Sequence, residues 1–470
     1  ELLAVIRQYN LPLQFPDTVI SEMEAIEESI SDKELAHRLD LRNILTFTID
    51  PASAKDFDDA ISLERINQGW RLYVHIADVA HYVKPESATF SEAVKRGNSF
   101  YFPKKVIPML PEKLSNKVCS LRPNEDKLAM SVITDFNLQG KIMRQRLEES
   151  VIRSDYRLNY DQVDELFSGK NTDFPSDLSE TLLSARKLSS LLTAKRLKEG
   201  YIFFDLPELE YEYDEEGFLK RFTLAEETES HKLIENFMLV ANECIATKLS
   251  KLAPATIYRI HEDPDWEKIE RLIELLSYYG ISFYERENLN ASIQYLLHSL
   301  PTPEHHKVFE PIILRSMKKA KYSTEHIRHF GLGMETYTHF TSPIRRLCDL
   351  IIHHLSKTYI LKTSKIQFDY SQLKHFASVA SEQELQADQS ERDIEHYFSM
   401  TYMKKFIGES FSGIVMSAKN DRLIIRLDQI PINAVLMVTE FPPGNWIFLD
   451  RQMRFINEDN RDYFQLMDKV

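Results

Sequence analysis

The chain has 470 residues, of which 43% are hydrophobic and 28% charged, with a formal net charge of -14. This composition is typical of a folded chain and excludes a disordered one, and the length predicts two or more domains. The acidic balance argues against nonspecific nucleic-acid binding over a basic surface, although it allows a local basic channel. No apolar run approaches the roughly 18 residues of a membrane helix, which predicts a cytoplasmic protein without membrane contact.

The first half of the chain mixes strand and helix patterns. The pattern of apolar and polar residues over residues 1–40 predicts a helix followed by a polar linker. From Ile44 the apolar period becomes that of strands, with a hairpin at Asn67–Gly69. The predicted strands cover residues 44–49, 59–66 and 70–79, and helical periods follow over residues 161–200 and 227–300. This order predicts a large mixed domain of the α+β class.

The residue pattern changes twice in the last quarter of the chain. A long helix with a polar middle is predicted over about residues 372–405, and short apolar runs separated by turns follow it. Several short strands over about 60 residues favour a small antiparallel barrel of the oligonucleotide-binding kind. The 12 glycines form neither GxGxxG nor GxxxxGK[ST], so we expect no nucleotide cofactor.

A dense group of carboxylates stands in the stretch TIDPASAKDFDDAI, residues 48–61. Asp50, Asp56, Asp58 and Asp59 fall within ten residues. In an extended segment Asp56 and Asp58 would share one face, and the turn after Pro51 would bring Asp50 back toward them. Such a cluster would be strongly disfavoured without a cation, and Mg²⁺ prefers a few carboxylates with phosphate and water. Two ions of this kind can activate water and stabilise an in-line phosphoryl displacement.

Two other interpretations of this stretch stay open at the level of the residues. One is a solvated acidic turn. The other is a calcium loop, which is disfavoured by the missing central glycine and by Asn67 at the twelfth position when Asp56 is counted as the first.

A second constellation is HFTSPIRRLCDLIIHH, residues 339–354. Ser342 is a candidate N-cap and Pro343 a candidate first helical residue, which would place Arg345 and Arg346 in the first turn of a helix. Cations are disfavoured there, and a bound phosphate would remove the conflict. A structural salt bridge is the alternative for these arginines.

Aromatic residues recur in polar surroundings. They are Tyr101, Tyr160, Phe203 and Phe204. Bases can stack on such rings without regard to sequence, although packing in the core is the ordinary use of any single ring.

The ordered segments DLRNILTFTIDPASAKDFDDA, YVHIADVAHYV, YFPKKVIPMLPEKLSNKVCSLRPNEDKLAM, YRIHEDPD, HFGLGMETYTHFTSPIRRLCDL and SERDIEHYF resemble the ribonuclease II and ribonuclease R family. The likeness is greater to ribonuclease R. It implies an RNB catalytic domain over residues 41–404 and an RNA-binding barrel over residues 405–470. Residues 1–40 resemble the segment that links the family's N-terminal cold-shock barrels to the catalytic domain, so those barrels are expected to be absent.

The resemblance implies a processive, hydrolytic 3′-to-5′ exoribonuclease that releases nucleoside 5′-monophosphates from single-stranded RNA. It also implies Mg²⁺, expected as two ions that Mn²⁺ can replace, and we expect a monomer. The rival is a catalytically silent relative that binds RNA as a regulator, and a calcium-stabilised structural domain is a third reading. Intact Asp50, Asp56, Asp58, Asp59 and Arg345 argue against the silent relative.

By resemblance, each candidate residue acquires a role. The aspartates hold the metals and the attacking water, with Asp58 also catalytic, and Arg345 steadies the charge on the scissile phosphate. Tyr160 contacts the reacting nucleotide. The RNA-binding group comprises Tyr101, either Phe203 or Phe204, Glu235, Arg346 and Glu391, of which the two glutamates would help to select ribose.

The chain departs from the family pattern at two places. Leu347-Cys348 stands where Tyr-Pro or Tyr-Ala is usual, and His354 stands where an arginine is common. We expect the first change to alter packing behind the helix and the second to remove a salt bridge, with an effect on rate rather than on the reaction.

Overall fold

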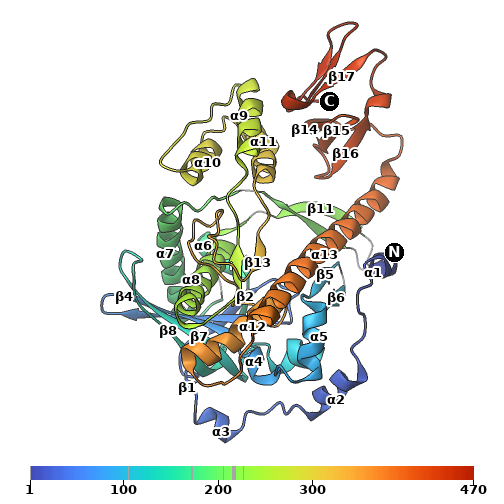
Figure 1. Cartoon of the computed structure of the whole chain (residues 1–470). Coiled ribbons are helices and arrows are strands. Elements are labelled where there is room, and N and C mark those ends of the chain that lie inside the picture. The colour runs from blue at the N-terminus through green and yellow to red at the C-terminus, as the bar shows by residue number, and fades with distance from the viewer. Residues whose placement is uncertain (1, 104, 171–172, 205, 214–218, 226) are drawn as a thin grey trace.

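The computed structural model describes all residues except 1, 104, 171–172, 205, 214–218 and 226. Helices and strands are mixed along the chain, and the predicted α+β class is confirmed (Figure 1). Among the described helices, none has the length and apolar character needed to cross a bilayer.

A large mixed sheet forms the base of the molecule. Its strands are β1 (Leu39–Asp40), β2 (Phe47–Asp50), β3 (Asp59–Ile66), β4 (Gly69–Ala77), β7 (Asp126–Asn137), β8 (Ile142–Arg153) and β9 (Tyr156–Asn159). In the described part of the chain their order is β1-β8-β7-β4-β3-β2-β9. The β3-β4 hairpin turns at Asn67 and Gln68, as predicted, and Gly69 is needed next because a Cβ there would lie 2.0 Å from the Phe136 carbonyl oxygen.

Helices cover both faces of this sheet. They include α4 (Val79–Tyr82), α5 (Ala88–Arg96), α6 (Tyr160–Phe167), α7 (Ser176–Lys198), α8 (Glu229–Leu252) and α12 (Leu347–Leu355). Helix α7 packs on β3 and α8 on β4, while α4 and α5 lie on the other side (Figure 1). The predicted apolar face of α8, with Leu233 and Phe237 fully buried, lies in the main hydrophobic core.

One segment expected to be helical contains a strand. Residues 258–260 form β12 (Tyr258–Ile260), which pairs with β13 (Lys321–Ser323). The helices α9 (Trp266–Tyr278), α10 (Leu289–His298) and α11 (Pro303–Ser316) follow β12. The continuous helical prediction over residues 227–300 was therefore wrong at this point, because a strand partner more than 60 residues away outweighs the local pattern.

The long helix α13 (Tyr370–Met403) closely follows its prediction. Asp369 and Gln372 form a capping box at its start. It runs diagonally across the molecule toward the C-terminal strands (Figure 1), and it contacts α12, β13, β5 and α1 in passing.

The remaining short elements surround this frame. They are α1 (Leu2–Gln8), α2 (Asp17–Ala25), α3 (Asp32–Leu35), β5 (Phe100–Phe102), β6 (Lys105–Ile107), β10 (Glu208–Tyr213), β11 (Leu219–Ala225) and two π-helical turns at Leu114–Val118 and Ser356–Leu361.

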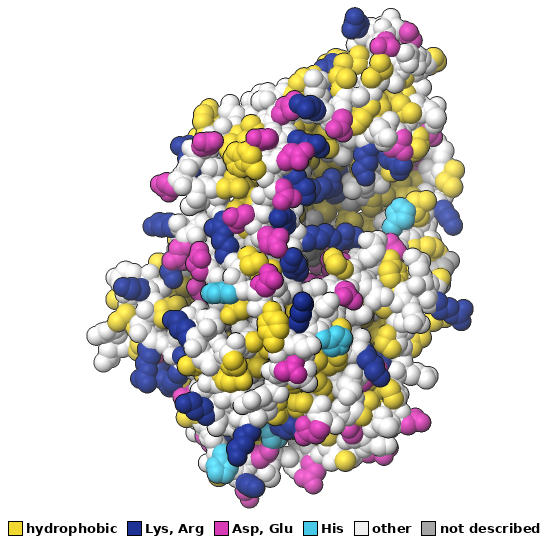
Figure 2. All heavy atoms as spheres, in the orientation of Figure 1, with side chains coloured by type: hydrophobic (Ala, Val, Ile, Leu, Met, Phe, Trp, Pro, Cys, Tyr) yellow, Lys and Arg dark blue, Asp and Glu magenta, His cyan; other side chains and the backbone are white. Residues whose placement is uncertain are grey.

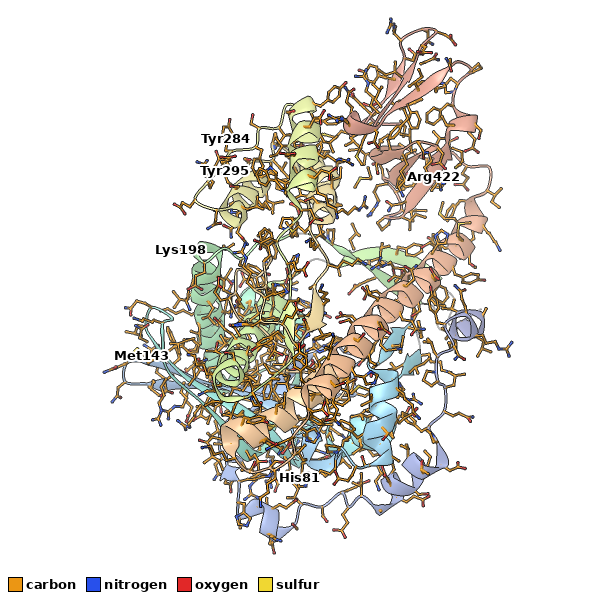
Figure 3. The ribbon with its side chains drawn as sticks, in the orientation of Figure 1. His81, Met143, Lys198, Tyr284, Tyr295 and Arg422 are labelled. Carbon is orange, nitrogen blue, oxygen red and sulfur yellow. The ribbon has the colours of Figure 1, made fainter. Side chains whose placement is uncertain are left out.

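The C-terminal part consists of small antiparallel sheets. Its strands are β14 (Gly413–Lys419), β15 (Arg422–Leu427), β16 (Asn433–Met437), β17 (Trp446–Leu449), β18 (Arg454–Asn457) and β19 (Tyr463–Phe464). Across residues 405–470, all of them described, the strands pair as β14-β15-β16 and β17-β18-β19 and do not close into one ring. Arg422 of this part and His81 of the base lie at opposite ends of the molecule (Figure 3).

Candidate active site

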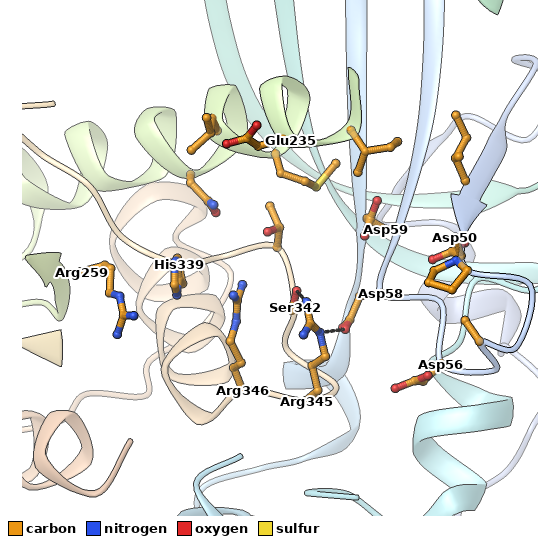
Figure 4. Close-up of a pocket in the computed structure, with 18 of the residues that line it drawn as sticks. Asp50, Asp56, Asp58, Asp59, Glu235, Arg259, His339, Ser342, Arg345 and Arg346 are labelled. Carbon is orange, nitrogen blue, oxygen red and sulfur yellow. Dashed lines mark hydrogen bonds and ion pairs between the residues drawn. The ribbon is translucent and has the colours of Figure 1, made fainter. Parts of the chain in front are cut away.

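A pocket of about 650 Å³ opens between the central sheet, α8 and the chain around Arg345. All four aspartates of the cluster line it, together with Tyr101, Tyr160, Glu235, Arg345 and Arg346 (Figure 4). The structure thus brings together nine of the predicted site residues from segments up to 296 positions apart. Phe203, Phe204 and Glu391 do not line it.

Neighbouring strands position two of the aspartates. Asp50 is the last residue of β2 and Asp59 the first of β3, and these strands are antiparallel neighbours. Burial raises the pKa of Asp59 to about 8, with the negative charge of Asp50 as the next cause. Burial likewise raises the pKa of Asp50 to about 6. The two carboxylates therefore need a nearby cation in order to be ionised together at neutral pH.

Asp58 faces the arginine segment directly. Its Oδ1 accepts a hydrogen bond of 2.8 Å from the backbone N-H of Ile344, and its Oδ2 lies 3.6 Å from Nε of Arg345. The Asp58 side chain is only 5% exposed, and burial raises its pKa well above the ordinary value even though Arg345 opposes the shift. The Arg345 side chain is 45% exposed, so its guanidinium can reach a ligand in the pocket.

Asp56 is tied to a neighbouring aromatic wall. The Tyr101 hydroxyl donates a hydrogen bond of 2.8 Å to Asp56 Oδ2, and the Tyr101 backbone N-H donates one of 3.3 Å to Glu391 Oε1 on α13. Burial raises the pKa of Tyr101, with the Asp56 charge as the next cause, so the phenol stays protonated and donates. Glu391 therefore acts on the strand that carries Tyr101, outside the pocket itself.

The arginine segment folds differently from its prediction. Ser342 to Arg346 form a turn, α12 begins only at Leu347, and Ser342 does not cap it. The Ser342 backbone N-H donates instead to Asp349 Oδ1 at 2.8 Å, and its hydroxyl accepts from Arg345 Nη2 at 3.2 Å. A fully buried carboxylate one turn into the helix thus replaces the expected cap, so the dipole conflict predicted for the arginines does not arise.

Arg346 is bound to the same buried carboxylate. Its Nε and Nη2 contact the two oxygens of Asp349 at 2.9 and 2.7 Å. Asp349 is the main partner that raises the Arg346 pKa against the effect of burial. The sequence allowed a structural salt bridge as the alternative role of Arg346, and the structure shows this salt bridge.

Tyr160 also lines the pocket. It is the first residue of α6, whose start is fixed by the Asn159-Gln162 capping box. Its ring stacks on His231 with centroids 3.7 Å apart and an interplanar angle of 14°. Burial is the main cause that raises the pKa of the Tyr160 hydroxyl, and the negative charges of Asp59 and Asp50 raise it further.

The two adjacent phenylalanines have different surroundings. Phe204 packs against the hydrophobic cluster that joins α9–α11 to the C-terminal strands. The Phe203 ring instead has Lys232 Nζ 4.2 Å from its centroid. On α8, Glu235 accepts a hydrogen bond of 3.0 Å from the Tyr201 hydroxyl.

Several residues that line the pocket had no assigned role in the sequence prediction. Arg259 on β12 lies beside His339 in the pocket wall (Figure 4). It also forms an ion pair with Glu384 of α13. Arg259 belongs to the segment YRIHEDPD, so the family pattern carried a signal for it. Its partner is 125 residues away, and no local spacing indicates it.

The departures from the family pattern are buried behind the site. Leu347 and Cys348 are fully buried in the core, where the predicted effect on packing would act. The imidazole of His354 is also fully buried, its Nε2 lies 3.0 Å from the Val83 carbonyl oxygen, and burial lowers its pKa to about 3.

The carboxylates fit a divalent cation in chemistry, although they are not pre-assembled around one. Among the described residues, no three His, Cys, Asp or Glu side chains already form a metal-binding group. Within the same residues, Asp50 Oδ2 is buried and accepts no hydrogen bond. An unsatisfied buried carboxylate oxygen beside a second carboxyl of raised pKa is the kind of ligand that a hard cation requires.

Comparison with known proteins assigns the class. A sequence model described as the RNB domain matches residues 38–362, and the chain therefore belongs to this family. Its relatives carry the name ribonuclease R. The protein of Aquifex aeolicus is 39% identical over 99% of this chain, and the match covers 67% of that protein. The predicted family membership is confirmed.

Solved structures agree with this assignment. The ribonuclease R of Mycoplasma genitalium, solved in complex with ribose-methylated single-stranded RNA, aligns with a TM-score of 0.93 and 30% identity over 100% of this chain and 74% of its own. Yeast Ssd1, described as a pseudonuclease, shares the fold with a TM-score of 0.74 at 17% identity, over 91% of this chain and 54% of its own. The chain spans between 57% and 67% of the length of the curated relatives.

Proposed function

We propose that the chain is the catalytic part of a processive 3′-to-5′ exoribonuclease that hydrolyses single-stranded RNA to nucleoside 5′-monophosphates. One observation carries the proposal: buried aspartates with raised pKa values and a partly exposed arginine converge on a single pocket. Membership of the RNB family and the likeness to a ribonuclease R solved with single-stranded RNA support RNA as the polymer.

The aspartate cluster is the proposed binding site for Mg²⁺, expected as two ions that Mn²⁺ can replace. Asp50, Asp56, Asp58 and Asp59 would hold them, and the bound cations would supply positive charge to the phosphate and lower the pKa of water. Asp58 holds Arg345 and the Ile344 amide in place through its two oxygens. The same two contacts fix the orientation of Asp58 relative to Arg345, the proposed partner of the phosphate.

Arg345 is the proposed partner of the scissile phosphate. Its Nη2 donates to the Ser342 hydroxyl, which orients the guanidinium at the pocket wall. A preoriented guanidinium stabilises the negative charge that develops on phosphate oxygens during displacement.

Aromatic and acidic residues are the proposed contacts for the bases and ribose. Tyr101 and Tyr160 both line the pocket. Phe203, whose ring is outside the hydrophobic cluster that holds Phe204, is the better candidate for a stacking ring. Glu235 is proposed to accept a hydrogen bond from a ribose hydroxyl. Glu391 is assigned an indirect effect, through the Tyr101 backbone.

Basic side chains also gather where RNA would approach. Figure 2 shows Lys and Arg along the hollow between the C-terminal strands and the body of the molecule, interspersed with acidic groups. A local basic surface of this kind is what an acidic chain needs to bind RNA.

The rival proposal is a silent RNA-binding relative. The likeness to Ssd1 means that the fold alone does not decide between activity and silence. The aspartates and Arg345 converge on one pocket here, which favours activity.

The Asp58→Asn variant tests the active-site assignment. We expect it to abolish turnover and to leave RNA affinity within a few-fold of the unaltered chain, because the amide keeps the shape and loses the charge. Hydrolysis and equilibrium RNA binding are measured on the same preparation. A fully active variant would contradict the role of Asp58.

A further inference from the structure

Residues 51–58, which we call the aspartate loop, have a second cavity behind them. This cavity of about 850 Å³ is called the rear pocket. Asp56 and Asp58 line the active-site pocket, whereas Lys55 and Phe57 line the rear pocket. This alternation is that of an extended chain with two faces. Ala54 lines both cavities, so a single chain segment separates them.

The rear pocket has the opposite charge to the active-site pocket. Its basic lining residues are Lys55, Lys113, Lys117, Arg122 and Arg157, and its acidic ones are Glu28 and Glu112. Five cations stand against two carboxylates in the lining, and Arg122 also pairs with Glu125 at 3.5 Å, which still leaves a local excess of positive charge in a chain of net charge -14. A concave surface lined by one sign of charge concentrates ions of the other sign.

Two of these cations have neutral hydrogen-bond partners. Lys113 Nζ donates to the carbonyl oxygens of Met23 and Ile26 at 2.7 and 2.8 Å. Arg157 Nη2 donates to those of Pro51 and Ala52 at 3.1 and 2.6 Å.

Arg157 also has unused hydrogen-bonding capacity. Within the described residues its buried Nε has no hydrogen-bond partner. A buried N-H without a partner is costly, and a shift of the Arg157 side chain would bring it to an anion in the rear pocket.

We infer that the rear pocket binds a phosphomonoester, namely the nucleoside 5′-monophosphate released on the other side of the aspartate loop. The inference rests on the proposed function, because that reaction supplies the ligand. A cavity of this size is within the range of small-molecule sites. The carboxylates around the reaction repel a dianionic product, and the cations behind Ala54 attract it. Inorganic phosphate shares the phosphate chemistry and lacks the nucleoside.

Binding is measured by equilibrium dialysis of AMP against the full chain in EDTA, which removes any metal-held phosphate from the active-site pocket. The test variant is Lys55→Glu, Lys117→Glu, Arg122→Glu. Lys55, Lys117 and Arg122 are exposed, so the fold should persist, and circular dichroism checks it. We expect AMP affinity to fall at least about ten-fold, since three nearby charges are reversed. Lys374→Glu, at an exposed site on α13, is the matched control and should bind AMP normally.

The ligands separate the possible sources of the signal. We expect AMP to bind more tightly than inorganic phosphate and adenosine not to bind. Phosphate binding as tight as AMP binding would overturn the assignment to a mononucleotide, and equal AMP binding by the triple variant would overturn the rear pocket as its site.

Kinetics tests the link to the reaction. We expect the triple variant to match the unaltered chain in a single-turnover cleavage and to be slower over many turnovers. Equal rates in both regimes would overturn the role in product release. If the unaltered chain binds AMP but does not hydrolyse RNA, the proposed function fails while the phosphomonoester site stands, so the two failures are distinguishable.

Discussion

At the scale of single residues, the site is a set of carboxyl groups whose ionised forms are disfavoured by burial. Asp50, Asp58 and Asp59 all have raised pKa values because they are buried, and one oxygen of Asp50 has no hydrogen-bond partner among the described residues. Arg345 opposes the shift of Asp58 but does not cancel it. These residues become stable together only when a cation or a phosphate completes the pocket.

The raised pKa values predict a pH-dependent stability without metal. The native state holds protons on Asp50 and Asp59 that the unfolded state has released, so the free energy of unfolding should fall as pH rises from about 4 to 8. Mg²⁺ should reverse most of this loss at pH 8. Denaturant unfolding across this pH range, in EDTA and in Mg²⁺, measures the free energy of unfolding under both conditions.

The Asp59→Asn variant is the matched control for this titration. It should lose much of the pH dependence and much of the Mg²⁺ effect. The same pH dependence in the variant would show that other groups cause it.

Arg345 should matter for rate far more than for stability. We expect Arg345→Ala to slow RNA hydrolysis by about 10² to 10³, as for loss of one preoriented donor to a developing charge. Arg392→Ala, an exposed arginine of α13, should change the rate little. Comparable slowing in both variants would remove the phosphate role from Arg345.

At the scale of elements, a buried carboxylate determines where a helix begins. Asp349 binds the Ser342 amide and the Arg346 guanidinium, and α12 starts after them. The turn left outside the helix presents Ile344 and Arg345 to Asp58. Helix α13 also positions residues of the site. Its Glu384 forms an ion pair with Arg259, and its Glu391 accepts a hydrogen bond from the backbone N-H of Tyr101.

Removing Asp349 should therefore destabilise the whole segment. Asp349→Ala leaves the Ser342 amide and the Arg346 guanidinium, whose side chain is 20% exposed, without their partner, and we expect a loss of about 1 to 3 kcal/mol in the free energy of unfolding. The exposed pair of Asp388 and Arg392 gives the control, since Asp388→Ala should have little effect. Urea unfolding of both variants compares them, and equal stabilities would contradict the role given to Asp349.

At the scale of the whole molecule, strand and helix patterns were well predicted and long-range contacts were not. The strand β3 matches its prediction because residues 60–63, three of which are apolar, are buried one after another on both faces of the sheet, and α13 matches because its capping box is local. Helix α12 starts later than predicted because the competing partner of Ser342 lies beyond the expected cap. The role of Arg259 could not be predicted from spacing, because its partner lies on a distant helix.

The C-terminal part is attached to the body by both apolar and polar contacts. Its strands share one hydrophobic cluster with α9–α11, and the Tyr279 hydroxyl donates to the Gln452 carbonyl at 2.9 Å. The hollow of Figure 2 between this part and the body is thus bordered by elements packed together.

The central claim is most directly tested by incubating the chain with RNA carrying a single-stranded 3′ tail and with DNA of the same sequence, each in Mg²⁺ and in EDTA. Chromatography of the products measures released mononucleotides. We predict nucleoside 5′-monophosphates from RNA in Mg²⁺ and from none of the other three mixtures. RNA that remains intact in Mg²⁺ after prolonged incubation would contradict the account.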